Sequence, residues 1–130
     1  MTGAAGAIGK GIARDFCRLG AKVFVTDLRQ DAVEATVGEL TGDGTCQGLA
    51  ADVTDEPQVR RVVEAAAEAF NGRIDVLVNV AGVVAQGKVE AIPEEEWERV
   101  FAVNCKGSFF FIKHVVPLMK AAGGGRIINF

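Results

Sequence analysis

Two kinds of apolar pattern alternate along the chain, and this alternation restricts the fold more than any other feature of the sequence. Short apolar runs typical of strands occupy residues 22–26, 74–80 and 126–130, and a weaker strand is expected near 46–51. Apolar residues recur at helical spacing over 8–19, 33–40, 59–70 and about 103–122, and a short acidic helix is expected over 93–101. Thr54 is the expected N-cap of the third of these helices. Strands separated by helices predict an α/β fold with a doubly wound parallel sheet, covered by helices on both faces in the Rossmann-like manner.

Length and charge narrow the class of protein. A chain of 130 residues with a formal net charge of -3 has room for one domain, expected over residues 1–130. Mild acidity argues against a nucleic-acid or anionic-membrane partner. The sequence contains no run of 18 apolar residues, which is the length that would predict a membrane span. No secretory leader is visible. The three widely spaced cysteines and the single histidine predict no disulfide framework and no metal site, and they favour a reducing, cytoplasmic location.

Polar and glycine residues follow the predicted strands in a repeated manner. A Gly-rich turn over residues 2–9 leads into the first helix, where backbone amides can bind a phosphate. Asp27, Asp52 with Val53, and the run Asn79-Val80-Ala81-Gly82 each close a later strand. Taken singly, the glycines could form only a tight turn and Asp27 could be a solvated turn residue. Together they lie at the carboxyl ends of parallel strands, which is the edge where open α/β sheets bind ligands.

These motifs resemble those of the short-chain dehydrogenase/reductase family across essentially the whole chain. TGAAGAIG resembles the family's TGxxxGxG turn, ADV its Asp-Val, and NVAG its NNAG, while Ala7 and Val80 depart from the pattern. EEEWERVFAVNCKG resembles the segment that carries a helix-borne Asn, here Asn104. The resemblance implies Asn104 as a catalytic residue and a cofactor site made by Gly3, Ile8, Gly9, Asp27, Asp52, Val53, Asn79, Ala81 and Gly82.

The same resemblance implies an oxidoreductase that moves a hydride between a nicotinamide cofactor and a small alcohol or carbonyl substrate. The family's catalytic Ser and Tyr-x-x-x-Lys would follow Phe130, and the chain contains no Tyr. We therefore expect the cofactor-binding portion of such an enzyme, inactive alone, with the first strand and the C-terminal strands of the fold missing. A non-catalytic nucleotide-binding module and a degenerate fragment are the alternatives.

The cofactor can be predicted more narrowly. Asp27 would accept hydrogen bonds from a free ribose 2′-hydroxyl and repel a 2′-phosphate, and no Arg or Lys precedes Lys10 in the Gly-rich turn. Arg29 is the one nearby feature that could accommodate the phosphate. NAD is therefore favoured over NADP.

The long helix suggests a partner. The helix has two apolar stripes, with its lysines on one narrow line, and therefore needs cover on two sides. One stripe consists of Cys105, Phe109, Ile112, Val116 and Met119, and the other of Gly107, Phe110, Phe111, Val115 and Leu118. One side can pack on the sheet, and the resemblance implies a homo-oligomer through the helix from Asn104 to Ala122, although a later helix of the same chain could cover it instead. Trp97 and Phe101 are expected in the core, and His114 as a packing or surface residue.

A missing first strand predicts a defect in the sheet. In the family's strand order, the strands at 22–26 and 74–80 flank that first strand, so a gap of about 10 Å would separate them. Either the gap stays, leaving a chain that is marginally stable, oligomeric or prone to aggregation, or the two strands close up and displace the Gly-rich turn.

Overall fold

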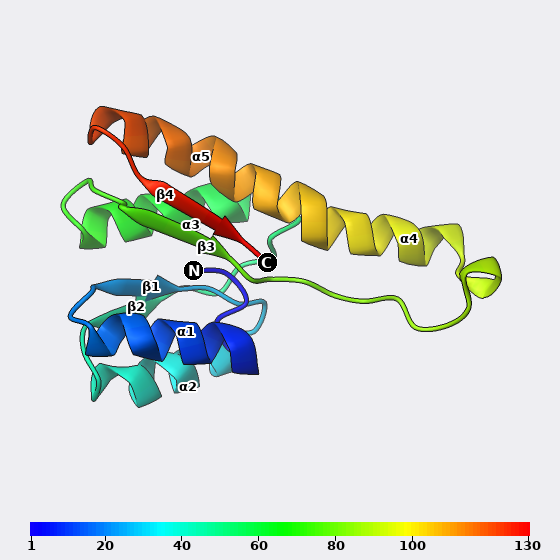
Figure 1. Cartoon of the computed structure of the whole chain (residues 1–130), viewed down its shortest axis with the longest axis horizontal. Coiled ribbons are helices and arrows are strands. Elements are labelled where there is room, and N and C mark those ends of the chain that lie inside the picture. The colour runs from blue at the N-terminus through cyan, green and yellow to red at the C-terminus, as the bar shows by residue number, and fades with distance from the viewer.

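The computed structural model describes residues 1–130 as an α/β fold with parallel strands, which confirms the predicted class (Figure 1). The elements in chain order are α1 (Ala7–Arg18), β1 (Val23–Val25), α2 (Gln30–Thr41), β2 (Cys46–Gly48), α3 (Glu56–Ala69), β3 (Val76–Asn79), a 3-10 turn η1 (Val89–Ala91), α4 (Glu94–Phe101), a π-helical segment η2 (Ala102–Gly107), α5 (Ser108–Ala121) and β4 (Arg126–Asn129). No helix is both long enough and apolar enough to cross a membrane.

The strands form two separate parallel pairs. β1 pairs with β2, with Val23 opposite Cys46, and β3 pairs with β4, with Leu77 opposite Ile127. The β1–β2 pair lies with α1 and α2 in one half of the molecule, and the β3–β4 pair lies with α3 and α5 in the other (Figure 1). β1 and β3 are not bonded to each other, so the strands have not closed up and the expected gap is present.

Each half has its own buried core. The first core joins α1, α2, β1 and β2 through small and branched side chains, among them Ala13, Val25, Val33 and Leu40. The second is larger and packs α3 and α5 against β3. Phe24 of β1 belongs to this second core and meets the ring of Phe70 edge-on, with the centroids 6.4 Å apart. The pleat of β1 therefore sends alternate side chains to the two halves.

The first two residues hold the halves together. The Met1 α-ammonium donates to the Phe24 carbonyl at 2.8 Å, and the Met1 carbonyl accepts from Thr26 N–H at 2.9 Å. On the other side, Thr2 N–H donates to the Val78 carbonyl at 3.0 Å. Met1 and Thr2 thus bond in the manner of a parallel strand between β1 and β3.

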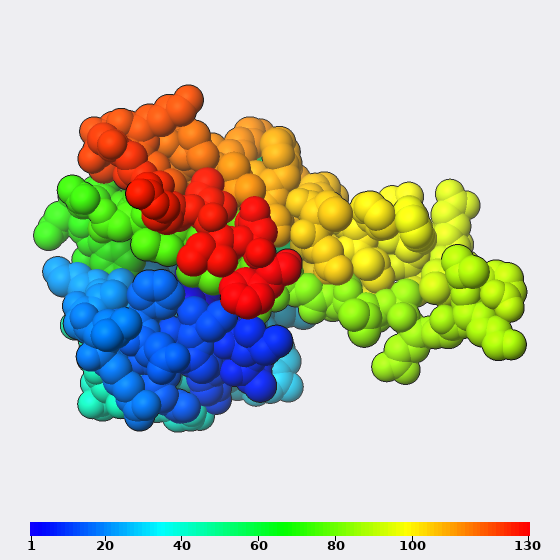
Figure 2. Space-filling view, viewed as in Figure 1, coloured from blue at the N-terminus to red at the C-terminus, as the bar shows by residue number.

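The helix that precedes β4 differs from its prediction. α4, η2 and α5 form one continuous helical rod, and α4 extends away from the body of the molecule (Figures 1 and 2). Trp97 and Phe101 stack on each other at 4.4 Å, but they are 55% and 44% exposed, so their expected place in the core is wrong. They lie on the projecting helix, where no other element covers them.

Two finer details also differ from expectation. Thr54 was the expected cap of α3, but Asp55 is the N-cap, and its carboxylate accepts from Gln58 N–H at 3.1 Å. Hydrogen bonds from the Gln58 side chain and backbone lower the pKa of Asp55. On the long helix, the buried line combines members of both predicted stripes and consists of Gly107, Phe111, Val115 and Met119.

Candidate nucleotide-binding site

The Gly-rich turn needs two of its glycines for close backbone contact. Gly3 has φ +62°, and a Cβ there would lie 2.7 Å from Ala81 N. A Cβ at Gly9 would collide with the Gly3 carbonyl oxygen, so Gly9 lets the first turn of α1 lie directly on the loop. Ala7 is exposed at the start of α1, which explains why the methyl group at this departure from the family pattern is accommodated.

The N-terminus of α1 carries no capping side chain. Its N-cap is Gly6, which offers no side-chain hydrogen bond, and no acidic residue lies in the first turn. The first amides of a helix have no partner within the helix, and the helix dipole favours negative charge beside them. Ile8 is exposed on this turn. The turn therefore presents free N–H groups beside an accessible surface, which suits a phosphate.

Asp27 lies against this turn. It follows β1, and its Oδ2 accepts from Ala5 N–H at 3.0 Å while its Oδ1 accepts from Leu28 N–H at 2.8 Å. The two sequence features that suggested a nucleotide site, the glycines and the acidic residue, are thus in direct contact. Arg29 is exposed and pairs with Asp31 at 3.3 Å rather than with Asp27.

Asp52 and Val53 form a second side of the same edge. Asp52 Oδ1 accepts from both the N–H and the hydroxyl of Thr54, at 2.8 and 2.7 Å, and this fixes the turn after β2. Val53 is buried against the long helix, where a Cβ on Gly107 would lie 2.7 Å from its Cγ2. Gly107 therefore allows the helix to approach the strand edge closely.

The loop after β3 is tied to the Gly-rich turn. The Thr2 hydroxyl accepts from the N–H groups of Val80 and Ala81, both at 3.1 Å. Asn79 is only 2% exposed, and its amide donates to Asn129 Oδ1 at 2.9 Å across the β3–β4 pair. Its own Oδ1 is buried without a partner. The Asn79 side chain thus lies inside the sheet, and the surface that this position offers a ligand is its backbone.

Asn104 lies on the π-helical segment and holds the same loop farther along. Its Oδ1 accepts from Val83 N–H at 2.8 Å, and its Nδ2 donates to the Val83 carbonyl at 2.9 Å. Ala81 and Gly82 lie just before this anchor. Both polar atoms of the Asn104 side chain are therefore occupied by backbone, while the Ser108 hydroxyl donates to the Asn104 carbonyl at 3.1 Å. The geometry makes Asn104 a residue that positions the loop at this edge.

His114 belongs to a different cluster. Its Nε2 lies 2.9 Å from Glu56 Oε1, which also accepts from Lys113 Nζ at 2.7 Å. Hydrogen bonds from Lys113 and His114 lower the pKa of Glu56. This cluster ties the start of α3 to α5 and takes no part in the candidate site, in keeping with a packing or surface histidine.

Three polar residues with structural hydrogen bonds were not singled out from the sequence: Thr2 and Thr26, which are buried, and Asn129, which is exposed. The Thr2 hydroxyl joins the two loops, the Thr26 hydroxyl donates to the Leu49 carbonyl at 2.7 Å, and Asn129 pairs with Asn79. Thr2 could have been chosen as part of the Gly-rich motif. Asn129 could be identified only once the register of β3 and β4 was known.

The matching family model is that of short chain dehydrogenase, and it matches residues 1–130. The chain belongs to the short-chain dehydrogenase family. D-threitol dehydrogenase of Mycolicibacterium smegmatis is 39% identical over 130 residues, and galactitol 2-dehydrogenase of Agrobacterium fabrum is 42% identical. Each alignment covers 99% of this chain and 50% of the relative. The chain therefore spans about half the length of the curated relatives it matches.

Solved structures of the family agree with the fold. A short-chain type dehydrogenase/reductase of Mycobacterium ulcerans superposes with a TM-score of 0.92 at 29% identity, covering 98% of this chain and 48% of that one. A variant of actinorhodin polyketide ketoreductase, solved with NADPH, has a TM-score of 0.93 at 35% identity, with 98% and 50% coverage. No group of three His, Cys, Asp or Glu side chains is placed to hold a metal ion.

Proposed function

We propose that this short-chain dehydrogenase chain is the cofactor-binding portion of an oxidoreductase that acts on a small alcohol or carbonyl substrate. The contact between Asp27 Oδ2 and Ala5 N–H carries the proposal, because it unites an uncapped helix terminus and an acidic residue in one site. The amides of α1 would bind the pyrophosphate, and Asp27 would face the adenosine ribose. A bound nicotinamide dinucleotide would supply or accept the hydride.

The remaining residues shape this edge. Thr2 and Asn104 hold the 80–83 loop from two sides, so the backbone of Ala81 and Gly82 would border the cofactor. Asp52 and Val53 would border the adenine, with Gly107 holding the long helix against them. Gly3, Ile8 and Gly9 would form the phosphate turn, and the backbone of Asn79 would close the site.

We propose NAD as the preferred cofactor of this portion. An ionised carboxylate at Asp27 accepts from hydroxyl groups and repels a phosphate. Arg29 is engaged by Asp31 and would have to leave that pair to neutralise a 2′-phosphate. A structural neighbour in this family was solved with NADPH, so membership of the family does not itself favour NAD, and the proposal rests on this local charge.

Catalysis and assembly would need more than these residues. The chain has no Tyr. We therefore propose that the chain alone binds the cofactor, as a nucleotide-binding module does, but does not turn over alcohols or carbonyls. The exposed aromatic rings of Trp97, Phe101 and Phe109 would lie at a homo-oligomer interface along α4 and α5. The three unpaired cysteines support a cytoplasmic location.

Calorimetric titration with NAD⁺ and NADP⁺ tests the cofactor site. Asp27→Ala should weaken NAD⁺ binding about ten- to a hundred-fold, since a hydrogen bond to a charged group contributes roughly 1.5–3 kcal/mol. The same change should reduce the discrimination against NADP⁺. Asp15→Ala removes an exposed carboxylate on α1 and should bind both cofactors as the unchanged chain does. Unchanged affinities in Asp27→Ala, with an unaltered melting curve, would contradict the proposal.

A further inference from the structure

Two buried thiols lie side by side in the first core. Cys17 is in the last turn of α1 and Cys46 begins β2, and their exposed fractions are 2% and 6%. Both belong to the cluster that joins α1, α2, β1 and β2, and a hydrogen bond connects their side chains. No third His, Cys, Asp or Glu side chain is placed to complete a metal site with them. The remaining cysteine, Cys105, is exposed on the π-helical segment, so the chain has one close dithiol and one isolated thiol.

The turn after α2 holds the two cysteine-bearing elements together. A Cβ on Gly44 would lie 2.7 Å from the Cys17 carbonyl oxygen, so this turn packs directly on the end of α1. Asp43 of the same turn accepts from Arg18 Nε at 3.0 Å. Because Gly44 is only two residues before Cys46, the close packing of the turn brings the second cysteine to the first. Two side chains that approach across such a contact suit a disulfide, which needs short distances between the Cβ atoms.

The two thiols differ in how readily they ionise. Burial raises the pKa of the Cys17 thiol, and the negative charge of Asp43 raises this pKa further. Burial raises the pKa of the Cys46 thiol to about 11, and the adjacent Cys17 adds to the shift. The hydrogen bond between the thiols lowers the pKa of Cys17 and raises that of Cys46, as follows when Cys46 donates and Cys17 accepts. Cys17 is therefore the sulfur that ionises first, and the thiolate is the nucleophilic form.

A surface hollow between α2 and β2 reaches the pair. Its lining includes Cys46, together with Gly38 and Gly48, which have no side chains to fill the space. Glu34 also lines the hollow and places a negative charge beside it. A small neutral oxidant can approach the thiols by this path, whereas the charge of Glu34 disfavours an anionic oxidant. Hydrogen peroxide meets both requirements.

We propose that Cys17 and Cys46 form a peroxide-reactive dithiol, which closes into an internal disulfide between α1 and β2. The Cys17 thiolate attacks one oxygen of hydrogen peroxide, the O–O bond breaks, and the leaving hydroxide takes up the proton that Cys17 had released. Cys17 is then a sulfenic acid. The Cys46 sulfur attacks the Cys17 sulfur, the S–O bond breaks, and the released hydroxide takes the Cys46 proton to become water. The two thiols lose two electrons in total, and one peroxide is reduced to two waters.

The surroundings favour the product of this reaction. Burial opposes a charged thiolate on either sulfur, whereas a disulfide is uncharged and suits an apolar core. The new bond would join the end of α1 to the start of β2 and enclose β1 and α2 in one covalent loop. It would thus fix α1, whose other end carries the Gly-rich turn, to the strand pair behind it.

Peroxide treatment of the full chain carrying Cys105→Ala tests for the bond. This variant removes the exposed thiol and so excludes disulfides formed through it between molecules. Under native conditions, the monomer should lose the mass of two hydrogen atoms, and peptide mapping without reduction should link Cys17 to Cys46. Dithiothreitol should reverse both changes. Absence of the disulfide at peroxide concentrations that fully oxidise a free cysteine peptide, or its appearance only in urea, would overturn the proposal.

Two further variants in the same background test the order of the sulfurs. Cys46→Ala should leave a sulfenic acid on Cys17 that dimedone traps. Cys17→Ala should give about ten-fold less adduct on Cys46, since each unit of pKa changes the thiolate fraction ten-fold. Equal trapping on the two cysteines would refute the assignment of Cys17 as the attacking sulfur.

The charge beside Cys17 offers an independent test that leaves both thiols in place. Asp43→Asn removes the carboxylate that opposes ionisation of Cys17, so the disulfide should form several-fold faster. Asp15→Asn removes an exposed carboxylate elsewhere on α1 and should leave the rate unchanged. The rate is measured by quenching the reaction with iodoacetamide and weighing the products. Equal rates in the two variants would contradict attack by Cys17.

Discussion

The two halves of the molecule use the same unit, a pair of short parallel strands, but they bury it very differently. All three residues of β1 are buried, whereas all four residues of β4 are exposed. Both strands carry apolar residues, as the sequences VFV and RIIN show. The difference arises because β1 has helices against both of its faces, while β4 has only β3 at one edge and no cover of its own. Burial of a strand is thus decided by its neighbours as much as by its composition.

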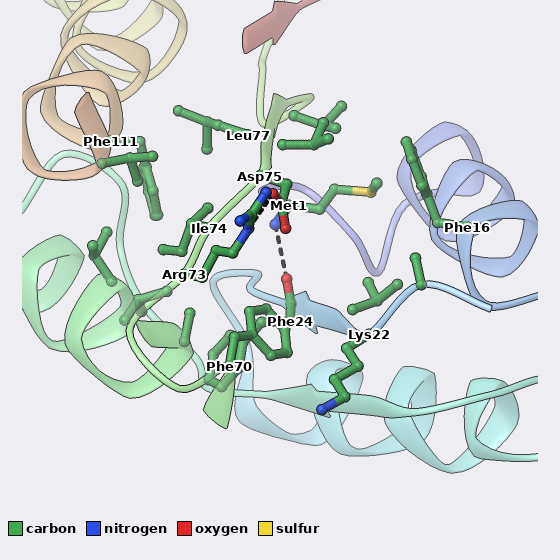
Figure 3. A pocket seen from close by; sticks show the side chains of 18 residues that line it. Met1, Phe16, Lys22, Phe24, Phe70, Arg73, Ile74, Asp75, Leu77 and Phe111 are labelled. Carbon is green, nitrogen blue, oxygen red and sulfur yellow. Dashed lines mark hydrogen bonds and ion pairs between the residues drawn. The ribbon is translucent and has the colours of Figure 1, made fainter. Parts of the chain in front are cut away.

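The packing and backbone hydrogen bonding within each half also differ from those at the boundary between the two halves. Within each half, strand pairing and helix packing satisfy the backbone and bury a core. At the boundary, the main links are the bonds of Met1 and Thr2 and the edge-on contact of Phe24 with Phe70. A partly open apolar groove of about 310 Å³ also lies between β1 and β3 at this boundary, where the side chains leave space unfilled (Figure 3). The boundary is therefore where this chain should separate first.

The largest expected effect contrasts two residues that lie opposite each other in the β3–β4 register. Leu77 is 4% exposed and Ile127 is 37% exposed. Leu77→Ala should lower the free energy of unfolding by about 2–5 kcal/mol, because it leaves a cavity in the core. Ile127→Ala should lower the free energy of unfolding by clearly less. Urea denaturation of both variants measures the difference, and equal losses would show that β4 is covered in solution.

A second prediction concerns pH at the boundary. Burial lowers the pKa of the Met1 α-ammonium from 8.0 to about 6. Between pH 6 and pH 8 the unfolded chain then binds more protons than the folded chain, so the free energy of unfolding should rise with pH, by about 2 kcal/mol. Denaturation across this range measures the slope.

Two controls isolate the amine as the source of that slope. Acetylation of the Met1 amine removes the titrating group and should flatten the slope between pH 6 and pH 8. His114→Gln removes the only histidine of the chain and is the comparison variant. A slope that survives acetylation but disappears in His114→Gln would assign the effect to the Glu56 cluster instead.

A smaller effect tests the hydroxyl that links the halves. Thr2→Val keeps the shape but leaves the N–H groups of Val80 and Ala81 without their acceptor, so it should cost about 1–2 kcal/mol. Thr41→Val removes a hydroxyl that donates to the Val37 carbonyl on an exposed helix surface, and it should change stability by less than about 0.5 kcal/mol. Thermal unfolding of both variants compares them; indistinguishable melting curves would mean that water replaces the Thr2 hydroxyl.

The sequence predicted those features in which one residue type meets one local requirement of the backbone. The glycines of the first turn, the acidic residues after the strands and the parallel α/β order were all predictable, because each follows from local pattern and from the geometry of parallel sheets. The contact of Asp27 with Ala5 follows from the same reasoning, since both lie at one sheet edge.

The features that were missed depend on distant neighbours or on small differences between similar residues. Asp55 and Thr54 are both good caps, and only the turn fixed by Asp52 leaves Asp55 in the capping position. The burial of the Asn79 side chain depends on Asn129, fifty residues later. The exposure of Trp97 could not be read from its apolar character, because the helix that carries it leaves the body.

The π-helical segment Ala102–Gly107 sets the rotation about the helix axis that relates the side chains of α4 to those of α5. An α-helix turns about 100° per residue, and a π-helical turn accommodates one additional residue. If the same residues continued as a regular α-helix, Trp97 and Phe101 would align with the line of Phe111 and Val115 that faces the core. The π-helical turn instead rotates the aromatic pair away from that line by roughly a quarter of a turn. The π-helical turn in the segment that carries Asn104 thus decides that the same helix shows one face to its own fold and another to its surroundings.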